Sequence, residues 1–146
     1  MRFFYKRVLV GIFLVAGISA QAAESLKMRL KSDLNTLDWG VAHTSYETYI
    51  IMNLMEGLVE LGSDLTPQPA LAEKWEMFAE GRIHRFTLKK NIFWSDGKPI
   101  TSNDFIAAWL RVLDPKLKSP YAHFLYDIEN AEAYHKGKIK DQRQVG

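Results

Sequence analysis

Apolar and polar side chains alternate most clearly in the middle of the chain, over residues 83–88. An alternation with a period of two predicts a half-buried strand. A short helical turn over residues 71–74 and a glycine-containing turn over residues 79–82 are expected to lead into this strand. A second alternation, over residues 26–30, predicts another short strand with one charged side.

A first helix is predicted around residues 46–54, because apolar side chains recur there at helical spacing. Thr44 or Ser45 is the expected N-terminal cap, and Gly57 is the expected left-handed C-terminal cap. The predicted buried stripe consists of Tyr46, Tyr49, Ile50, Asn53 and Leu54. Residues 58–61 then predict a brief strand, and the prolines within residues 66–69 predict an extended segment.

A turn and a second helix are predicted beyond the central strand. Asp96 and Gly97 favour a tight turn, because glycine adopts positive φ without a clash from a Cβ atom. Thr101 and Asp104 form a capping-box pattern that predicts the start of a helix. The apolar stripe of this helix consists of Phe105, Ala108, Trp109 and Val112. The Asp-Pro pair at residues 114–115 is expected to end it.

Shorter elements are predicted toward the end of the chain. Residues 119–125 are expected to open a short helix with Phe124 and Leu125 pointing inward, and residues 128–134 to form another. The tail at residues 141–146 is polar and carries no predicted structure. Three tryptophans are expected to pack in the core and not to form a ligand platform: Trp75, Trp94 and Trp109.

The composition is that of a folded protein, and its charge pattern argues against one class of partner. With 146 residues and 47% hydrophobic residues, the chain can form one domain with its own core. Residues 1–22 carry three basic residues and no acidic one, whereas the remainder has 16 basic and 17 acidic residues. No basic patch with interleaved aromatic residues is visible, so nucleic acid is not an expected partner.

Residues 1–22 have the three parts of an export signal. A cationic start precedes an apolar run over residues 8–18, and Ala20 and Ala22 then give the A-x-A pattern, so cleavage after Ala22 is predicted. A membrane anchor is the alternative, but the run is shorter than the roughly 20 residues that a spanning helix needs. The chain contains no cysteine, hence neither a disulfide framework nor a lipid-carrying residue, and a freely soluble periplasmic protein is expected.

The sequence carries no recognisable catalytic pattern. The four histidines, His43, His84, His123 and His135, are scattered and form no metal-binding pair on a helix. The serines lie in no G-x-S-x-G elbow, and no phosphate-binding G-x-x-x-x-G-K-[ST] loop is present. An exported hydrolase therefore lacks support, and neither enzymatic activity nor a cofactor is expected.

Two segments resemble a known family. P-x-x-A-L-A-E-K-W at residues 67–75 and F-T-L-K-K-N-I-F-W-S-D-G-K-P-I-T-S-N-D-F at residues 86–105 are similar to the peptide-binding branch of the solute-binding proteins that serve ABC transporters, solute-binding protein family 5. The similarity runs nearly without gaps from about residue 36 to about residue 140. It implies an α/β fold, namely the N-terminal part of a two-lobed periplasmic binding protein with a mixed sheet and packed helices.

The resemblance also implies a division of the chain and a function. Residues 23–55 would be the first segment of the main ligand-binding lobe, and residues 56–146 an incomplete inserted α/β subdomain of a truncated protein. The implied function is that of a monomeric receptor that binds an oligopeptide and delivers it to an inner-membrane ABC permease. The alternatives are a relative that carries dipeptides, murein peptides, nickel chelates or sugars, and a truncated gene product without function.

Two positions are implied to contact the ligand. Tyr121, in the S-P-Y-A element, is expected to reach a peptide, because its ring covers apolar surface while its hydroxyl meets backbone groups. Packing at a helix start is the alternative for Tyr121. His43, Thr44 and Ser45 are expected to hold the peptide main chain. His43 stands where close relatives carry an acidic residue, and capping of the next helix is the alternative for Thr44 and Ser45.

Overall fold

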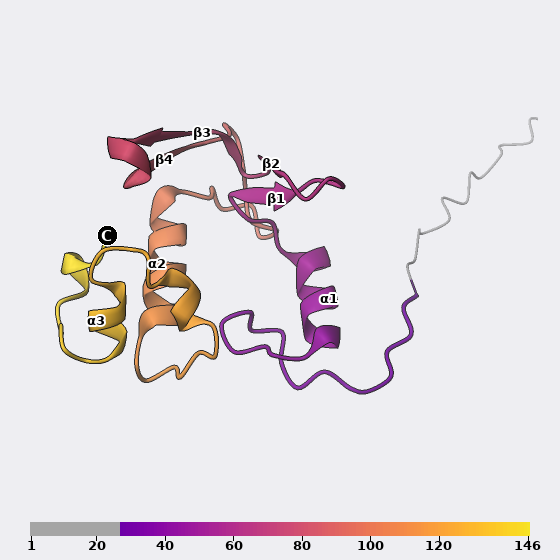
Figure 1. Cartoon of the computed structure of the whole chain (residues 1–146). Coiled ribbons are helices and arrows are strands. Elements are labelled where there is room, and N and C mark those ends of the chain that lie inside the picture. Colours follow the sequence, from indigo (N-terminus) through magenta and orange to yellow (C-terminus); the bar gives the residue numbers. More distant parts are fainter. Residues whose placement is uncertain (1–26) are drawn as a thin grey trace, which may run out of the picture.

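The computed structural model describes residues 27–146, so the predicted signal segment lies outside the described residues. Its helices are α1 (Ser45–Leu54), α2 (Ser102–Leu113) and α3 (Ala131–His135), with short 3-10 helices η1 (Ala79–Gly81), η2 (Ala122–Leu125) and η3 (Gln142–Gln144). Its strands are β1 (Val59–Leu61), β2 (Pro67–Pro69), β3 (Ala72–Phe78) and β4 (Ile83–Leu88). Figure 1 shows the strands along the top, α1 on one side below them, and α2 with α3 on the other.

Helix α1 begins at one of the predicted caps, Thr44. The Thr44 hydroxyl oxygen accepts a hydrogen bond from the backbone N–H of Glu47 at 3.3 Å. In return, the Glu47 carboxylate accepts the backbone N–H of Thr44 at 2.9 Å. The predicted C-terminal cap is wrong, because Met55 is already extended and Gly57 is not left-handed. Met55 donates its backbone N–H to the carbonyl oxygen of Ile51 and the chain runs on toward β1, so no left-handed residue is needed.

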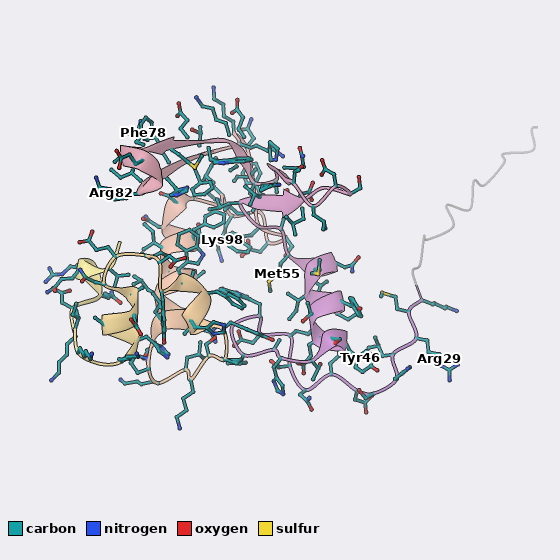
Figure 2. The ribbon with its side chains drawn as sticks, in the orientation of Figure 1. Arg29, Tyr46, Met55, Phe78, Arg82 and Lys98 are labelled. Carbon is teal, nitrogen blue, oxygen red and sulfur yellow. The ribbon has the colours of Figure 1, made fainter. Side chains whose placement is uncertain are left out.

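The predicted apolar stripe of α1 is only partly buried. Tyr49 and Leu54 are 59% and 63% exposed, whereas Glu47 is completely buried. Within residues 27–146 no other helix or strand makes an extensive contact with α1, and in Figure 2 side chains on one side of this helix project into open space. The helical spacing therefore identifies the helix correctly, but not the face that this part of the chain buries.

The described strands form two antiparallel pairs, β1 with β2 and β3 with β4, and not the mixed sheet that the resemblance implies. Each pair joins consecutive strands through a short connection, which allows only antiparallel neighbours. β4 matches the predicted strand, and β1 and β2 lie in the segments predicted to be extended. The α/β class is confirmed.

Two local predictions about strands are wrong. Residues 71–74 do not form a helical turn, because β3 begins at Ala72 and pairs with β4 across a bulge between Ala72 and Lys74. Residues 27–30 are not a strand, and no described strand pairs with them; Leu26 lies outside the described residues. In both places pairing with a neighbour decides the structure, and the local pattern does not.

The turn predicted at Asp96 and Gly97 is confirmed. Gly97 has a φ of +85°, and Trp94 donates its backbone N–H to the carbonyl oxygen of Lys98 at 2.8 Å. Trp94 itself is 49% exposed, because it lies at an exposed turn, so its predicted place in the core is wrong. Trp75 and Trp109 are partly buried.

Helix α2 confirms the predicted start, stripe and end. Thr101 donates its backbone N–H and its hydroxyl to the carboxylate of Asp104 at 2.7 and 2.9 Å. The stripe is buried or partly buried throughout: Phe105, Ala108, Trp109 and Val112. The helix ends at Leu113, with Asp114 extended as its C-terminal cap.

The core lies where α2 meets η2 and α3. Its fully buried members are Val112, Leu113, Ala122 and Ala131, and Leu125, Tyr126, Ile128, Tyr134 and Val145 pack against them. Leu125 points inward as predicted, but Phe124 is 72% exposed. A 3-10 helix has about three residues per turn, so these two neighbouring side chains point in different directions.

The tail is structured, contrary to the prediction. η3 occupies Gln142–Gln144, and the side-chain amide of Asn130 donates to the carbonyl oxygen of Gln144 at 2.7 Å. Gly146 donates its backbone N–H to the carbonyl oxygen of Glu129 at 3.0 Å. These partners are more than ten residues apart in sequence, so no local pattern in the tail could indicate them.

Candidate functional site

The loop before α1 is held by one buried carboxylate, that of Glu47, which is 0% exposed. It accepts the backbone N–H groups of Asn35 at 3.0 Å, His43 at 3.0 Å and Thr44 at 2.9 Å. The hydrogen bond from the Thr44 backbone is the main cause that lowers the pKa of Glu47 to about 2. An ionised carboxylate therefore fixes the loop at both of its ends.

A second carboxylate, that of Asp38, shapes the middle of this loop. Its Oδ1 atom accepts the backbone N–H of Gly40 at 3.0 Å, and its backbone carbonyl oxygen accepts the N–H groups of Val41 and Ala42 at 3.1 and 2.9 Å. The backbone N–H of Asp38 donates to the hydroxyl oxygen of Thr36 at 3.0 Å. Residues 36–42 thus form a compact turn whose bonds converge on one residue.

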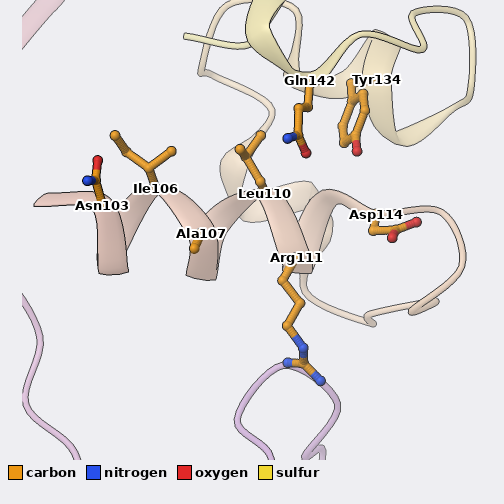
Figure 3. Close-up of a pocket in the computed structure, with 8 residues that line it drawn as sticks. All are labelled: Asn103, Ile106, Ala107, Leu110, Arg111, Asp114, Tyr134 and Gln142. Atoms are coloured by element: carbon orange, nitrogen blue, oxygen red, sulfur yellow. The ribbon is translucent and has the colours of Figure 1, made fainter.

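Arg111 joins this turn to α2 through two parallel hydrogen bonds. Its Nη1 atom donates to Oδ1 of Asp38 at 2.9 Å, and its Nη2 atom donates to Oδ2. Figure 3 shows the Arg111 side chain extending from α2 toward the loop that carries Asp38. The hydrogen bond from Arg111 lowers the pKa of Asp38, and the same bond raises the pKa of Arg111.

Gly40 allows this close approach. A Cβ atom at residue 40 would lie 2.9 Å from Nη1 of Arg111 and 3.4 Å from a side-chain carbon of Leu117. The turn is therefore in contact both with the end of α2 and with the segment that leads from α2 to Tyr121.

The predicted site residues of the loop lie next to one another. His43 is exposed, with its ring Nδ1 atom 3.3 Å from the carbonyl oxygen of Val41. Thr44 is the helix cap, as the alternative interpretation holds, and Ser45 is exposed in the first turn of α1. A cap role does not exclude a second role, so ligand contact at these residues stays a prediction.

Tyr121 is half-buried and directly precedes η2. Its backbone N–H donates to the hydroxyl oxygen of Ser119 at 3.3 Å, and its ring stacks with that of Phe124 at a centroid distance of 6.0 Å. Its hydroxyl makes no hydrogen bond to another residue in the described part of the chain. No hydrogen bond or ring contact within residues 27–146 joins Tyr121 to residues 43–45.

A shallow groove of about 440 Å³ lies beside α2, separate from the predicted site residues (Figure 3). It is lined by Asn103, Ile106, Ala107, Leu110, Arg111, Asp114, Tyr134 and Gln142. Within residues 27–146 no group of acidic or histidine side chains is placed to hold a metal ion. Over the same residues, every helix is too short or too polar to cross a membrane.

Sequence reasoning missed Glu47, Asp38 and Arg111. The Thr-x-x-Glu pattern at residues 44–47 could have identified Glu47, because it is the same capping-box pattern as the one recognised at Thr101. No comparable signal exists for Asp38 and Arg111, which are 73 residues apart.

Comparison with known proteins assigns the chain to a family. The family model described as "Bacterial extracellular solute-binding proteins, family 5 Middle" matches residues 66–142, which is more than half of the chain. The chain belongs to this family. The predicted family is thereby confirmed, and the matched range includes α2 and Tyr121.

Curated family 5 relatives include proteins named for different ligands. The chain is 47% identical to the dipeptide-binding protein DppE of Bacillus subtilis over 60% of its own length and 16% of that protein. It is 40% identical to the probable deoxycholate-binding periplasmic protein YgiS of Escherichia coli, over 73% of this chain and 20% of that protein. The oligopeptide-binding protein OppA of Bacillus subtilis is 36% identical, over 78% of this chain and 21% of that protein. The chain thus spans about a fifth of the length of these relatives.

Solved structures of family 5 proteins have the same fold over this segment. The murein tripeptide binding protein MppA of Escherichia coli matches with a TM-score of 0.74 and 37% identity, over 80% of this chain and 23% of that one. OppA of Haemophilus influenzae in complex with RPPGFSPFR matches with a TM-score of 0.73 and 33% identity, over 79% of this chain and 23% of that one. These neighbours are two-lobed periplasmic binding proteins, so the predicted fold class is confirmed.

Proposed function

We propose that this chain is the N-terminal part of a periplasmic receptor that binds oligopeptides and delivers them to an inner-membrane ABC permease. The observation that carries the proposal is its membership of family 5 together with similarity to members named for dipeptides, oligopeptides and a murein tripeptide. The family and its neighbours are binding proteins. A receptor without enzymatic activity or cofactor accords with this.

We assign the peptide contacts to Tyr121 and to the loop residues His43, Thr44 and Ser45. A receptor for peptides of varied sequence must hold the backbone of its ligand, and a rigid loop with short polar side chains can do so. Glu47 and Asp38 supply the rigidity of this loop. The hydroxyl of Tyr121, which has no hydrogen-bond partner within residues 27–146, can bond a peptide carbonyl or amide group.

The remaining parts of the proposal concern organisation and location. Residues 23–55 belong to the first segment of the main lobe, and residues 56–146 to the inserted subdomain. Residues 1–22 direct export and are removed by cleavage after Ala22, and the receptor acts as a monomer. The periplasmic names of several relatives support the location.

A second candidate ligand is a bile acid such as deoxycholate. The 40% identity to the probable deoxycholate-binding protein, over 73% of this chain, favours it. Tyrosine is equally suited to such an amphipathic ligand, because its ring can cover an apolar ring system while its hydroxyl bonds a polar group.

Calorimetry of the full-length protein distinguishes the two candidates. The protein is titrated with a dipeptide, with mixed tri- to pentapeptides, with a murein tripeptide and with deoxycholate. The proposal expects heat of binding from one of the peptide samples. Binding of deoxycholate alone would replace the proposed ligand, and no binding by any of them would contradict the receptor function.

Tyr121→Phe tests the assigned contact. Loss of one neutral hydrogen bond should weaken peptide binding by about threefold to tenfold. Tyr49→Phe is the matched control, because it removes the same hydroxyl from an exposed tyrosine on α1. Equal affinities of the Tyr121→Phe protein and the unaltered protein would show that the Tyr121 hydroxyl does not bind the peptide.

A further inference from the structure

The Asp38–Arg111 ion pair differs from the other ion pairs within residues 27–146 in the segments that it joins. The other pairs link residues two or four positions apart in sequence, whereas Asp38 and Arg111 are 73 residues apart. Asp38 is 34% and Arg111 46% exposed. Exposed ion pairs are usually weak, but two parallel bonds between a planar guanidinium and a carboxylate also fix the relative orientation of the groups.

Asp38 passes this orientation on to the loop. Its Oδ1 atom accepts both the Arg111 side chain and the backbone N–H of Gly40, so one oxygen atom joins the ion pair to the turn. Two further backbone bonds, from Val41 and Ala42 to the Asp38 carbonyl oxygen, bring the chain to His43. Arg111 is therefore connected through Asp38 to the turn that leads to His43, while Glu47 holds the backbone of His43 and Thr44.

Arg111 also lies near the start of the segment that leads to Tyr121. It lies two positions before the end of α2, and the chain then runs through Leu117 to Tyr121. The Leu117 side chain is near the turn, because it would lie only 3.4 Å from a Cβ atom at residue 40. One ion pair thus joins the turn that precedes residues 43–45 to the helix whose end leads to Tyr121.

We infer that Asp38 and Arg111 form a positioning pair that holds the loop at residues 43–45 in register with Tyr121 and thereby determines the affinity for an extended peptide backbone. This inference rests on the proposed peptide-binding function. Neither residue contacts the peptide. Both act by removing the freedom of the loop before the ligand arrives, which lowers the entropy that binding would otherwise lose.

A double-mutant cycle on the full-length protein tests the inference. Asp38→Asn and Arg111→Gln remove one charge each, and peptide affinity is measured for both single variants and for the double variant. Each single change should weaken binding by about threefold to fivefold. The peptide affinity of the double variant should equal that of whichever single variant binds less tightly, because both changes break the same interaction. Arg111→Lys, which keeps the charge without the paired bonds, should restore part of the affinity.

Lys136→Gln is the matched control. It removes one positive charge from another exposed ion pair, that with Glu132 on α3, which lies away from the loop. Its peptide affinity should equal that of the unaltered protein. Weakening of binding by the control to the same extent, or additive effects of Asp38→Asn and Arg111→Gln, would overturn the inference in favour of a general effect of charge.

Amide hydrogen exchange without ligand provides a second measurement that does not depend on peptide binding. Arg111→Gln should accelerate exchange at Val41 and Ala42 and leave exchange at Val112 and Leu113 in the core unchanged. Acceleration at all four amides would indicate loss of general stability and overturn the positioning role. If the unaltered protein binds no peptide, the proposed function fails, and the exchange pattern alone decides whether the pair positions the loop.

Discussion

At the scale of single residues, the candidate site depends on carboxylates that hold backbone amides. Glu47 is buried without a basic partner among its hydrogen bonds and is compensated by three backbone N–H groups. A carboxylate that accepts several backbone amides is strongly favoured in its ionised form. The loop structure and the charge of Glu47 therefore depend on each other.

The stability of the protein should decrease in acid partly because of Glu47. The pKa of Glu47 is about 2 in the folded chain, whereas the ordinary value of 4.5 applies to the unfolded chain. The unfolded state therefore binds the proton of Glu47 more readily. The stabilisation is present above about pH 4.5 and is lost as the pH falls toward about 2. Thermal unfolding between these pH values should show a smaller pH dependence for Glu47→Gln than for the unaltered protein.

Asp38→Asn serves as the comparison in the same experiment, because the pKa of Asp38 is also lowered, chiefly by Arg111. Removal of either titrating group should flatten the acid side of the stability profile. A profile for Glu47→Gln that runs parallel to that of the unaltered protein would contradict the role assigned to Glu47.

What the sequence could reveal about the site was limited by the distance between partners. The cap at Thr44 was predictable, because its partner Glu47 is three residues away. The bond from Asn35 to the same carboxylate, 12 residues away, and the bond from Arg111 to Asp38, 73 residues away, have no local pattern. Such contacts depend on how the elements are arranged in space, which periodicity does not report.

At the scale of elements, the predictions succeeded where local chemistry is decisive and failed where pairing is. The turn at Gly97 and the cap at Thr101 depend on a few adjacent residues and were predicted correctly. β3 begins with residues that favour a helix, but its hydrogen bonds to β4 override that preference. The exposed face of α1 could not be predicted, because an amphipathic pattern does not state what packs against it.

Gly97→Ala should destabilise the protein by about 1–2 kcal/mol, because a Cβ atom is unfavourable at positive φ. Gly97 has a φ of +85° in the turn that connects residues 94 and 98. The free energy of unfolding is measured in urea. Gly97→Asn is the control, since asparagine tolerates the left-handed region and should cost less. Equal losses for both variants would indicate that conformational strain is not the cause.

At the scale of the whole molecule, the buried core is small and lies to one side. It is formed where α2 meets η2 and α3, with Leu113 completely buried among alanines and one valine. The strand pairs and α1 lie outside this cluster. The stability of the described part of the chain should therefore depend strongly on few side chains.

Leu113→Ala should reduce the free energy of unfolding by about 2–5 kcal/mol, because it removes a buried side chain and leaves a cavity. Ile106→Ala is the control on the same helix, where Ile106 is 52% exposed. The control should cost much less, because little of its surface is removed from water. The free energy of unfolding of both variants is measured by chemical denaturation. Similar losses of stability would show that the cluster around Leu113 is not the main core.

The exposed apolar side chains of α1 lead to the opposite expectation. Met52 and Leu54 are 71% and 63% exposed, and α1 has no extensive contact with another element within residues 27–146. Replacement of an exposed side chain that touches little changes stability by about 0.5 kcal/mol or less. In the 146-residue chain, Met52→Gln should therefore leave the unfolding midpoint nearly unchanged, while binding of a hydrophobic dye decreases, because exposed apolar surface is what such a dye binds. Thr48→Gln, at another exposed position of α1, is the control and should change neither quantity. A marked loss of stability in Met52→Gln would mean that this face is packed in solution.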